Sequence, residues 1–180
     1  LIEFQIQIGV NGIVPCGTTG ESPTLSSEEH KSVIEFVIEK VAGRCKVIAG
    51  TGSNCTREAI DLSKEAERDG ADACLVVNPY YNKPTQEGLF LHFRAIANAV
   101  SIPVIVYNIK GRTGVNVETS TLMRIADACP NVIGVKEASG DMSQMKDVIA
   151  KRKEGFFVLS GDDNLTLELV RNGGDGVISV

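Results

Sequence analysis

The sequence has no tryptophan, only two histidines and no paired cysteine motif. Two histidines, His30 and His92, are too few for a His-based metal site, so we expect no bound metal. The five cysteines are scattered and form no C-x-x-C pair, which suits reduced thiols in a cytoplasmic protein better than a disulfide framework. They stand at Cys16, Cys45, Cys55, Cys74 and Cys129.

Long apolar runs and basic clusters are also missing. No apolar segment approaches the roughly 20 residues that span a bilayer, so we expect no membrane partner. The first residues show no positively charged start followed by an apolar stretch, so no signal peptide is predicted. The 18 basic and 23 acidic residues are interspersed and give a net charge of −5, which argues against a nucleic-acid partner.

What the sequence does have is a regular alternation of short apolar segments and amphipathic stretches. Most apolar segments are rich in Val and Ile on both faces, as in strands of a buried parallel sheet. The seven predicted strands are Gly12–Cys16, Lys46–Thr51, Ala73–Asn78, Pro103–Asn108, Val132–Glu137, Phe156–Ser160 and Gly176–Val180. No linker or low-complexity tract divides the chain, so residues 1–180 are predicted to form a single domain.

Helix signals occupy the intervening stretches. Ser26 and Glu29 have the spacing of a capping box, and the helical apolar pattern that follows ends at Gly43. A second helix begins near Thr56 and is predicted to end at Gly70. Further helices are predicted over Leu89–Val100, Leu122–Cys129, Met142–Ala150 and Leu165–Arg171.

Strands joined by helices predict right-handed crossovers and one parallel sheet, either open and doubly wound or closed into a (β/α)8 barrel. No G-x-G-x-x-G opens a helix. Polar residues recur at the carboxyl ends of nearly every predicted strand. An open sheet gathers ligand groups mainly at one switch point, whereas a barrel collects them from many strands, so the barrel is favoured.

Lys136 is the most specific single candidate for a functional residue, because it stands near the end of an otherwise apolar predicted strand. Burial lowers the pKa of a lysine and yields a neutral amine that attacks carbonyl carbon. The same position also suits a lysine that extends to the barrel rim or pairs with an acid.

Three other segments at strand ends carry polar groups. The turn Gly17–Glu21 exposes successive N–H groups that suit a carboxylate or phosphate. A Gly-rich turn that connects a strand to a helix and binds no ligand has the same sequence pattern. Tyr107 ends a strand, where a phenol can exchange protons with a substrate oxygen. Arg112 follows on a predicted loop and can hold a carboxylate by two hydrogen bonds. Tyr80 and Tyr81 fit either an interface or a catalytic role.

Taken together, these segments resemble the dihydrodipicolinate synthase / N-acetylneuraminate lyase family of class I aldolases. The matching stretches follow the family's order and spacing over nearly the whole chain. They are GIVPCGTTGESPTL (12–25), AGTGSN (49–54), NPYYNKP (78–84), VYNIKGRTG (106–114), GVKEASG (134–140), LSGDD (159–163) and GVISV (176–180).

The resemblance implies an incomplete (β/α)8 TIM barrel that contains strands 2–8 and lacks the first strand and the C-terminal helices. A typical barrel has roughly 250 residues. Two unpaired sheet edges would remain, so we expect the isolated chain to be poorly soluble or inactive and to derive from a longer polypeptide. It also implies a homo-oligomer, a dimer of dimers.

The resemblance further implies the role of each site residue. Lys136 would form an imine with pyruvate, whose carboxylate Thr18 and Thr19 would hold. Tyr107 would transfer protons in a hydroxyl relay with Thr18 and with Tyr81 from a neighbouring subunit. The remaining pocket residues would be Arg112, which binds the second substrate's carboxylate, and the backbone at Gly161 and Ile178. No metal or organic cofactor is implied.

Within the family, the stretches Arg112–Gly114 and Lys136–Ser139 favour condensation of pyruvate with L-aspartate 4-semialdehyde to 4-hydroxy-tetrahydrodipicolinate, in lysine and diaminopimelate biosynthesis. Two alternatives fit the same residues: an aldolase acting on N-acetylneuraminate or a 2-oxo sugar acid, and a non-catalytic binding protein on the same barrel. Lys110 departs from the family by replacing a proline that would stiffen the loop of Arg112.

The resemblance also implies a lysine inhibitor site at a subunit interface. Its residues would be Ser22, His30, Asn54, Glu58 and Tyr80. Ser27 stands where some members have histidine.

Overall fold

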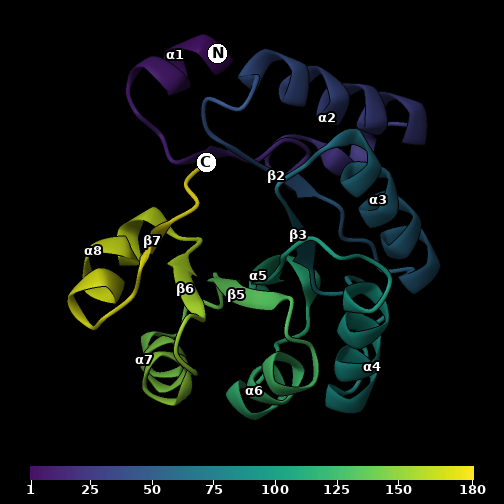
Figure 1. Cartoon of the computed structure of the whole chain (residues 1–180). Helices are drawn as coiled ribbons and strands as arrows, with labels where there is room; N and C mark the ends of the chain where they lie inside the picture. The colour runs from purple at the N-terminus through teal and green to yellow at the C-terminus, as the bar shows by residue number, and fades with distance from the viewer.

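The structure, a computed structural model, describes all residues from 1 to 180 and contains one curled parallel sheet with helices outside it (Figure 1). The strands lie side by side in chain order, and every neighbouring pair is parallel. They are β1 (Gly12–Ile13), β2 (Lys46–Gly50), β3 (Ala73–Val77), β4 (Val104–Asn108), β5 (Val132–Glu137), β6 (Phe157–Ser160) and β7 (Gly176–Val177). The prediction of an incomplete (β/α)8 barrel is confirmed, with β1 and β7 at its outer edges.

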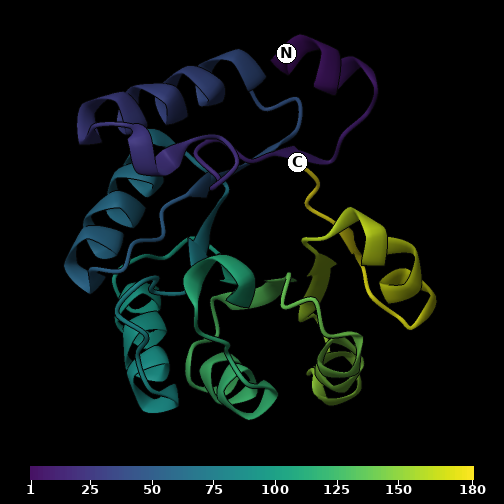
Figure 2. The same cartoon turned by 180° about the vertical axis from the view of Figure 1, so that it is seen from behind.

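Most helices surround the sheet in an open arc, with α5 near the centre of the view, as Figures 1 and 2 show from opposite sides. They are α1 (Ile2–Gln7), α2 (Ser27–Val41), α3 (Thr56–Asp69), α4 (Gln86–Ala97), α5 (Lys110–Thr113), α6 (Thr119–Ala128), α7 (Met142–Lys151) and α8 (Asp163–Arg171), with a 3₁₀ turn at Ser22–Thr24. No helix is long and apolar enough to cross a membrane.

Alternation along the strands divides the apolar side chains into two layers. Cys74, Val76, Val104 and Val106 point outward and pack with the helices in the main core. A second cluster, centred on Leu75, Ile105 and Tyr107, fills the inside of the curled sheet, as in barrels of this kind. The period of two therefore places Tyr107 inside the barrel.

The sequence signals at helix ends act as predicted. In the capping box at the start of α2, Glu29 N donates to Ser26 Oγ at 3.2 Å and Ser26 N donates to Glu29 Oε2 at 2.8 Å. Helix α3 ends at Gly70, whose φ of 98° lies in the left-handed region. Helix α6 ends at Cys129, the residue before Pro130, in an extended conformation that a following proline favours.

Three elements were not predicted. The segment containing Arg112, expected to be a loop, forms the short helix α5. Helix α1 and the 3₁₀ turn at Ser22–Thr24 were also missed, since neither is long enough for an apolar period to show. Strands β1 and β7 contain two residues each and are shorter than expected.

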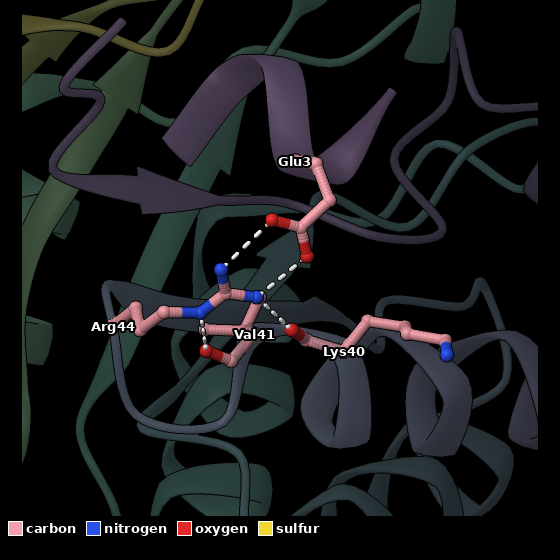
Figure 3. Close-up of polar contacts among 4 residues, drawn as sticks. All are labelled: Glu3, Lys40, Val41 and Arg44. Atoms are coloured by element: carbon pink, nitrogen blue, oxygen red, sulfur yellow. Dashed lines mark hydrogen bonds and ion pairs between the residues drawn. The ribbon is translucent and has the colours of Figure 1, made fainter. Parts of the chain in front are cut away.

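One arginine forms a polar link between helix α1 and the end of α2, in addition to the apolar packing of Ile2 and Ile6 (Figure 3). The Arg44 guanidinium donates to both carboxylate oxygens of Glu3, at 2.8 and 2.6 Å. It also donates to the carbonyls of Lys40 and Val41, at 2.5 and 3.1 Å. Arg44 therefore satisfies terminal carbonyls of α2 while it binds a side chain of α1.

Candidate active site

Lys136 and Tyr107 lie on neighbouring strands at the carboxyl end of the sheet. The two residues are register partners of β5 and β4, and both side chains are buried, with 5% and 6% exposure. The Lys136 Nζ atom lies 4.4 Å from the centroid of the Tyr107 ring. The structure thus brings the predicted amine and the predicted phenol together.

Burial shifts the proton affinity of both groups. Desolvation lowers the pKa of the Lys136 amine from 10.5 to about 8, against the opposing field of Asp163. The same cause raises the pKa of the Tyr107 hydroxyl, which Arg112 opposes. A large share of the amine is therefore uncharged in mildly alkaline solution, while the phenol keeps its proton.

Gly161, directly after β6, leaves room for the lysine stem. A Cβ added to Gly161 would lie 2.8 Å from Lys136 Cε and 2.8 Å from Ala138 Cβ, closer than carbon atoms pack. Ile178, after β7, joins the interior cluster that contains Tyr107. Both residues predicted to line the pocket therefore lie at the same end of the sheet.

A cavity of about 380 Å³ opens beside Tyr107, while Lys136 behind the ring is not part of its wall. Its walls include Thr18, Tyr107 and Arg112. The turn that carries Thr18 packs tightly on β2, because a Cβ on Gly50 would lie 2.2 Å from the carbonyl oxygen of Cys16. Glycine at position 50 is what permits this approach.

Arg112 reaches the cavity wall from α5 although Lys110 replaces the family's proline. Lys110 occupies the first position of α5, and Gly114 ends the helix with a φ of 75°. The helix therefore forms without proline at its first position.

The residues of the implied inhibitor site border the same cavity. Ser22, His30, Glu58 and Tyr80 all contribute to its wall, whereas Asn54 does not. His30 is buried, its Nε2 lies 2.9 Å from the carbonyl oxygen of Gly50, and burial lowers its pKa. One cavity therefore contacts four residues of the implied inhibitor site together with Thr18, Tyr107 and Arg112 of the predicted substrate site.

Six predicted residues are absent from the cavity wall: Thr19, Asn54, Tyr81, Lys136, Gly161 and Ile178. Thr19 is exposed, and Tyr81 is 88% exposed with a left-handed φ of 71°. No hydrogen bond joins the hydroxyl groups of Thr18, Tyr81 and Tyr107 within the chain. Tyr81 as the contribution of a second subunit therefore stays a prediction.

Sequence reasoning missed a buried polar row on the outer face of the same strand ends. It consists of Asn78, Asn108 and Glu137, all with 0% exposure, together with Gln144 of α7. The available signal was Glu137 itself, a second charged residue beside Lys136 in an apolar strand. Alternation places adjacent residues on opposite faces, so Glu137 points away from the inside of the barrel, where Lys136 lies.

The inward arrangement matches the needs of carbonyl chemistry. It combines a desolvated amine with a protonated phenol, and the phenol lines one cavity together with an arginine. A neutral amine is a nucleophile toward carbonyl carbon, a phenol can donate to the carbonyl oxygen, and a guanidinium binds carboxylates.

The chain is similar to known proteins over nearly its whole length. The chain is 60% identical over 180 residues to the 4-hydroxy-tetrahydrodipicolinate synthase of Syntrophus aciditrophicus and spans 62% of that protein. The crystal structure of dihydrodipicolinate synthase from Aquifex aeolicus superposes with a TM-score of 0.98 at 51% identity, over 99% of this chain and 61% of that one.

A third relative is the chloride-inhibited dihydrodipicolinate synthase of Acinetobacter baumannii, solved in complex with pyruvate. It is 51% identical, with a TM-score of 0.96, over 99% of this chain and 61% of that one. The chain thus spans about three fifths of the length of these relatives. The model of the dihydrodipicolinate synthetase family matches residues 1–180, and the chain belongs to that family.

Proposed function

We propose that this chain carries the catalytic lysine of a class I aldolase, a lyase that condenses pyruvate with L-aspartate 4-semialdehyde to 4-hydroxy-tetrahydrodipicolinate. The observation that carries the proposal is the desolvated Lys136 amine, which lies against the ring of Tyr107, a residue of the cavity wall. The family and the pyruvate complex of the Acinetobacter baumannii relative support the choice of substrate. The product serves lysine and diaminopimelate biosynthesis.

In the proposed reaction, the neutral Lys136 amine attacks the keto carbon of pyruvate, and water leaves to give a protonated imine. The imine withdraws electrons, so the methyl group loses a proton and becomes an enamine carbon. That carbon bonds to the aldehyde carbon, whose oxygen takes up a proton. The amino group of the former semialdehyde then attacks the imine carbon, which closes the ring, breaks the bond to Lys136 and releases the amine. Tyr107 exchanges these protons with the substrate oxygens, with Thr18 and a partner subunit's copy of Tyr81 as the rest of the relay.

Carboxylate binding is assigned to two regions. The backbone and hydroxyl groups of Thr18 and Thr19 hold pyruvate, since successive N–H groups in a turn suit an anion. Arg112 on the cavity wall holds the carboxylate of the aldehyde. Gly161 and Ile178 line the pocket with backbone groups. This chemistry uses protein groups alone, with no cofactor.

We also propose that residues 1–180 fold as part of one barrel domain, that the protein assembles as a dimer of dimers and that it acts in the cytoplasm. The exposed Tyr81 supports the assembly, because its side chain is available to a second copy. We further propose that lysine inhibits the enzyme, because four of the five residues of the implied inhibitor site border the cavity. These five residues are Ser22, His30, Asn54, Glu58 and Tyr80. Unchanged activity at millimolar lysine would remove the inhibition proposal.

The second candidate is another pyruvate-dependent aldolase of the family, acting on N-acetylneuraminate or a 2-oxo sugar acid. It uses the same imine and differs only in the aldehyde. Arg112 favours aspartate semialdehyde, because this aldehyde carries its own carboxylate. Rates measured with aspartate semialdehyde and with sugar aldehydes distinguish the two candidates.

Borohydride reduction in the presence of pyruvate tests the shared step. The experiment uses the 180-residue chain and a completed barrel, in which residues 1–180 replace the matching part of the Syntrophus aciditrophicus protein. Peptide mass analysis is expected to find a pyruvyl adduct on Lys136 and none on exposed Lys146, which pairs with Glu168. No adduct on Lys136 in the completed barrel would overturn the proposal.

A further inference from the structure

The buried carboxylate of Glu137 lies directly behind the proposed catalytic pair. Tyr107 and Lys136 are register partners on the inner face of β4 and β5, and the next residues, Asn108 and Glu137, are partners on the outer face. Asn108 Nδ2 donates to Glu137 Oε2 at 3.1 Å and lies 3.3 Å from Oε1. Tyr107 is thus followed by Asn108 and Lys136 by Glu137. The hydrogen bonds between Asn108 and Glu137 join β4 to β5 directly behind the catalytic pair.

Two further donors complete the surroundings of this carboxylate. The backbone N–H of Ser139 donates to Oε1 at 2.7 Å, and Gln144 Nε2 of α7 donates to Oε2 at 3.2 Å. The carboxylate therefore connects β4, β5 and α7 at one point. No lysine or arginine pairs with it in the structure.

Backbone groups fix the orientation of both amides. Asn108 Oδ1 accepts from Val117 N at 3.0 Å, so its nitrogen must face Glu137. Gln144 Nε2 donates to the carbonyl oxygen of Val117 at 3.1 Å, which turns its nitrogen to the same side. Every hydrogen-bond partner of the Glu137 carboxylate is consequently an N–H donor. A glutamine at this position would bring its own NH₂ group against these donors, where it has no acceptor.

We infer that Glu137 is a positioning residue, whose carboxylate ties the ends of β4 and β5 and so fixes the Lys136 amine relative to the Tyr107 phenol. The inference rests on the proposed function, since it concerns the same imine. Glu137 lies on the face opposite the cavity, so it acts through the backbone, without touching substrate. A displacement of about 1 Å at reacting groups costs as much as 100-fold in rate, so this connection affects catalysis.

The decisive measurement separates rate from the amount of folded protein. In the completed barrel, Glu137→Gln is expected to lower the rate constant of imine formation at saturating pyruvate by about 10- to 100-fold. The pyruvate concentration at half-saturation is expected to stay within about twofold, because the turn assigned to the pyruvate carboxylate, Thr18 and Thr19, is not part of this connection. Glu137→Asp, which keeps the charge, is expected to recover part of the rate. Loss of folded protein would lower the amplitude and leave the rate constant unchanged.

Asn131→Ala is the matched control. Asn131 Nδ2 donates to the carbonyls of Ala97, Val100 and Ile102 at the opposite end of β5, so its loss removes buried hydrogen bonds without touching the site. This variant is expected to keep the wild-type rate constant. An equal fall in rate for Asn131→Ala, or an unchanged rate for Glu137→Gln, would overturn the inference.

A second measurement needs no activity. The Ala138 amide donates to the carbonyl oxygen of Asn108 at 2.8 Å, directly beside the proposed connection. Glu137→Gln is expected to accelerate hydrogen exchange of this amide in the 180-residue chain, relative to Asn131→Ala. Equal protection in both variants would refute the connection, whereas a missing pyruvyl adduct in wild type refutes only the proposed function.

Discussion

The Lys136 ammonium group faces the Tyr107 ring at 4.4 Å, a distance at which a cation is attracted to the aromatic face. This attraction favours the charged amine, yet the pKa of Lys136 falls to about 8. Desolvation is thus the larger effect, because the side chain is only 5% exposed and no carboxylate pairs with it. The Tyr107 ring therefore still attracts the charged amine, while burial makes that amine release its proton more readily.

Lys136→Met is expected to stabilise the protein at pH 7. The shift of the lysine pKa from 10.5 to about 8 corresponds to roughly 3 kcal/mol, which a neutral side chain of similar length avoids. Between pH 8 and 10.5 the unfolded chain binds more protons than the native one, so wild-type stability rises with pH and the difference shrinks. Urea unfolding of both proteins at pH 7 and pH 10 measures this.

Lys146→Met provides the control for that measurement, since the Lys146 side chain is 47% exposed and pairs with Glu168. Its stability difference from wild type is expected to be small at both pH values. A Lys136→Met difference that stays constant from pH 7 to pH 10 would show that the amine is not desolvated.

Gly161→Ala is expected to displace the lysine stem. The new Cβ would meet Lys136 Cε and Ala138 Cβ at 2.8 Å, so the amine or the strand must move. We expect the rate of imine formation in the completed barrel to fall by about 10-fold or more. Gly111→Ala is the control, because no atom lies within 4 Å of its added Cβ. A wild-type rate for Gly161→Ala would mean that the stem adapts without cost.

The parts predicted from sequence are those with a strong local pattern. Buried strands have apolar residues on both faces, so all seven were found, and Lys136 stood out as a charge within one of them. Helix α5 was missed because four residues carry no period. The connection between Asn108 and Glu137 joins residues 29 positions apart, so only the strand register reveals it.

Arg44→Ala is expected to loosen α1 without unfolding the barrel. Arg44 links Glu3 to the last carbonyls of α2, and both side chains are largely exposed, so the effect is local (Figure 3). Hydrogen exchange is expected to accelerate in residues 1–8 and stay unchanged in β4 and β5. Lys151→Ala, which breaks an exposed pair within α7, serves as control. Unchanged exchange in α1 would assign its attachment to apolar packing alone.

Restoring the family's proline tests the geometry of α5. Lys110 is the first residue of this helix, where proline is well tolerated, and Ile109 before it has φ −136° and ψ 80°, outside the helical region that proline disfavours. Lys110→Pro is therefore expected to raise the free energy of unfolding by about 0.4–1 kcal/mol, by restricting the unfolded chain. Lys110→Ala, which removes the same side chain, is expected to fall short of this gain in urea unfolding. Destabilisation by proline, with alanine neutral, would show that position 110 has a different backbone conformation in solution and that Arg112 is held differently.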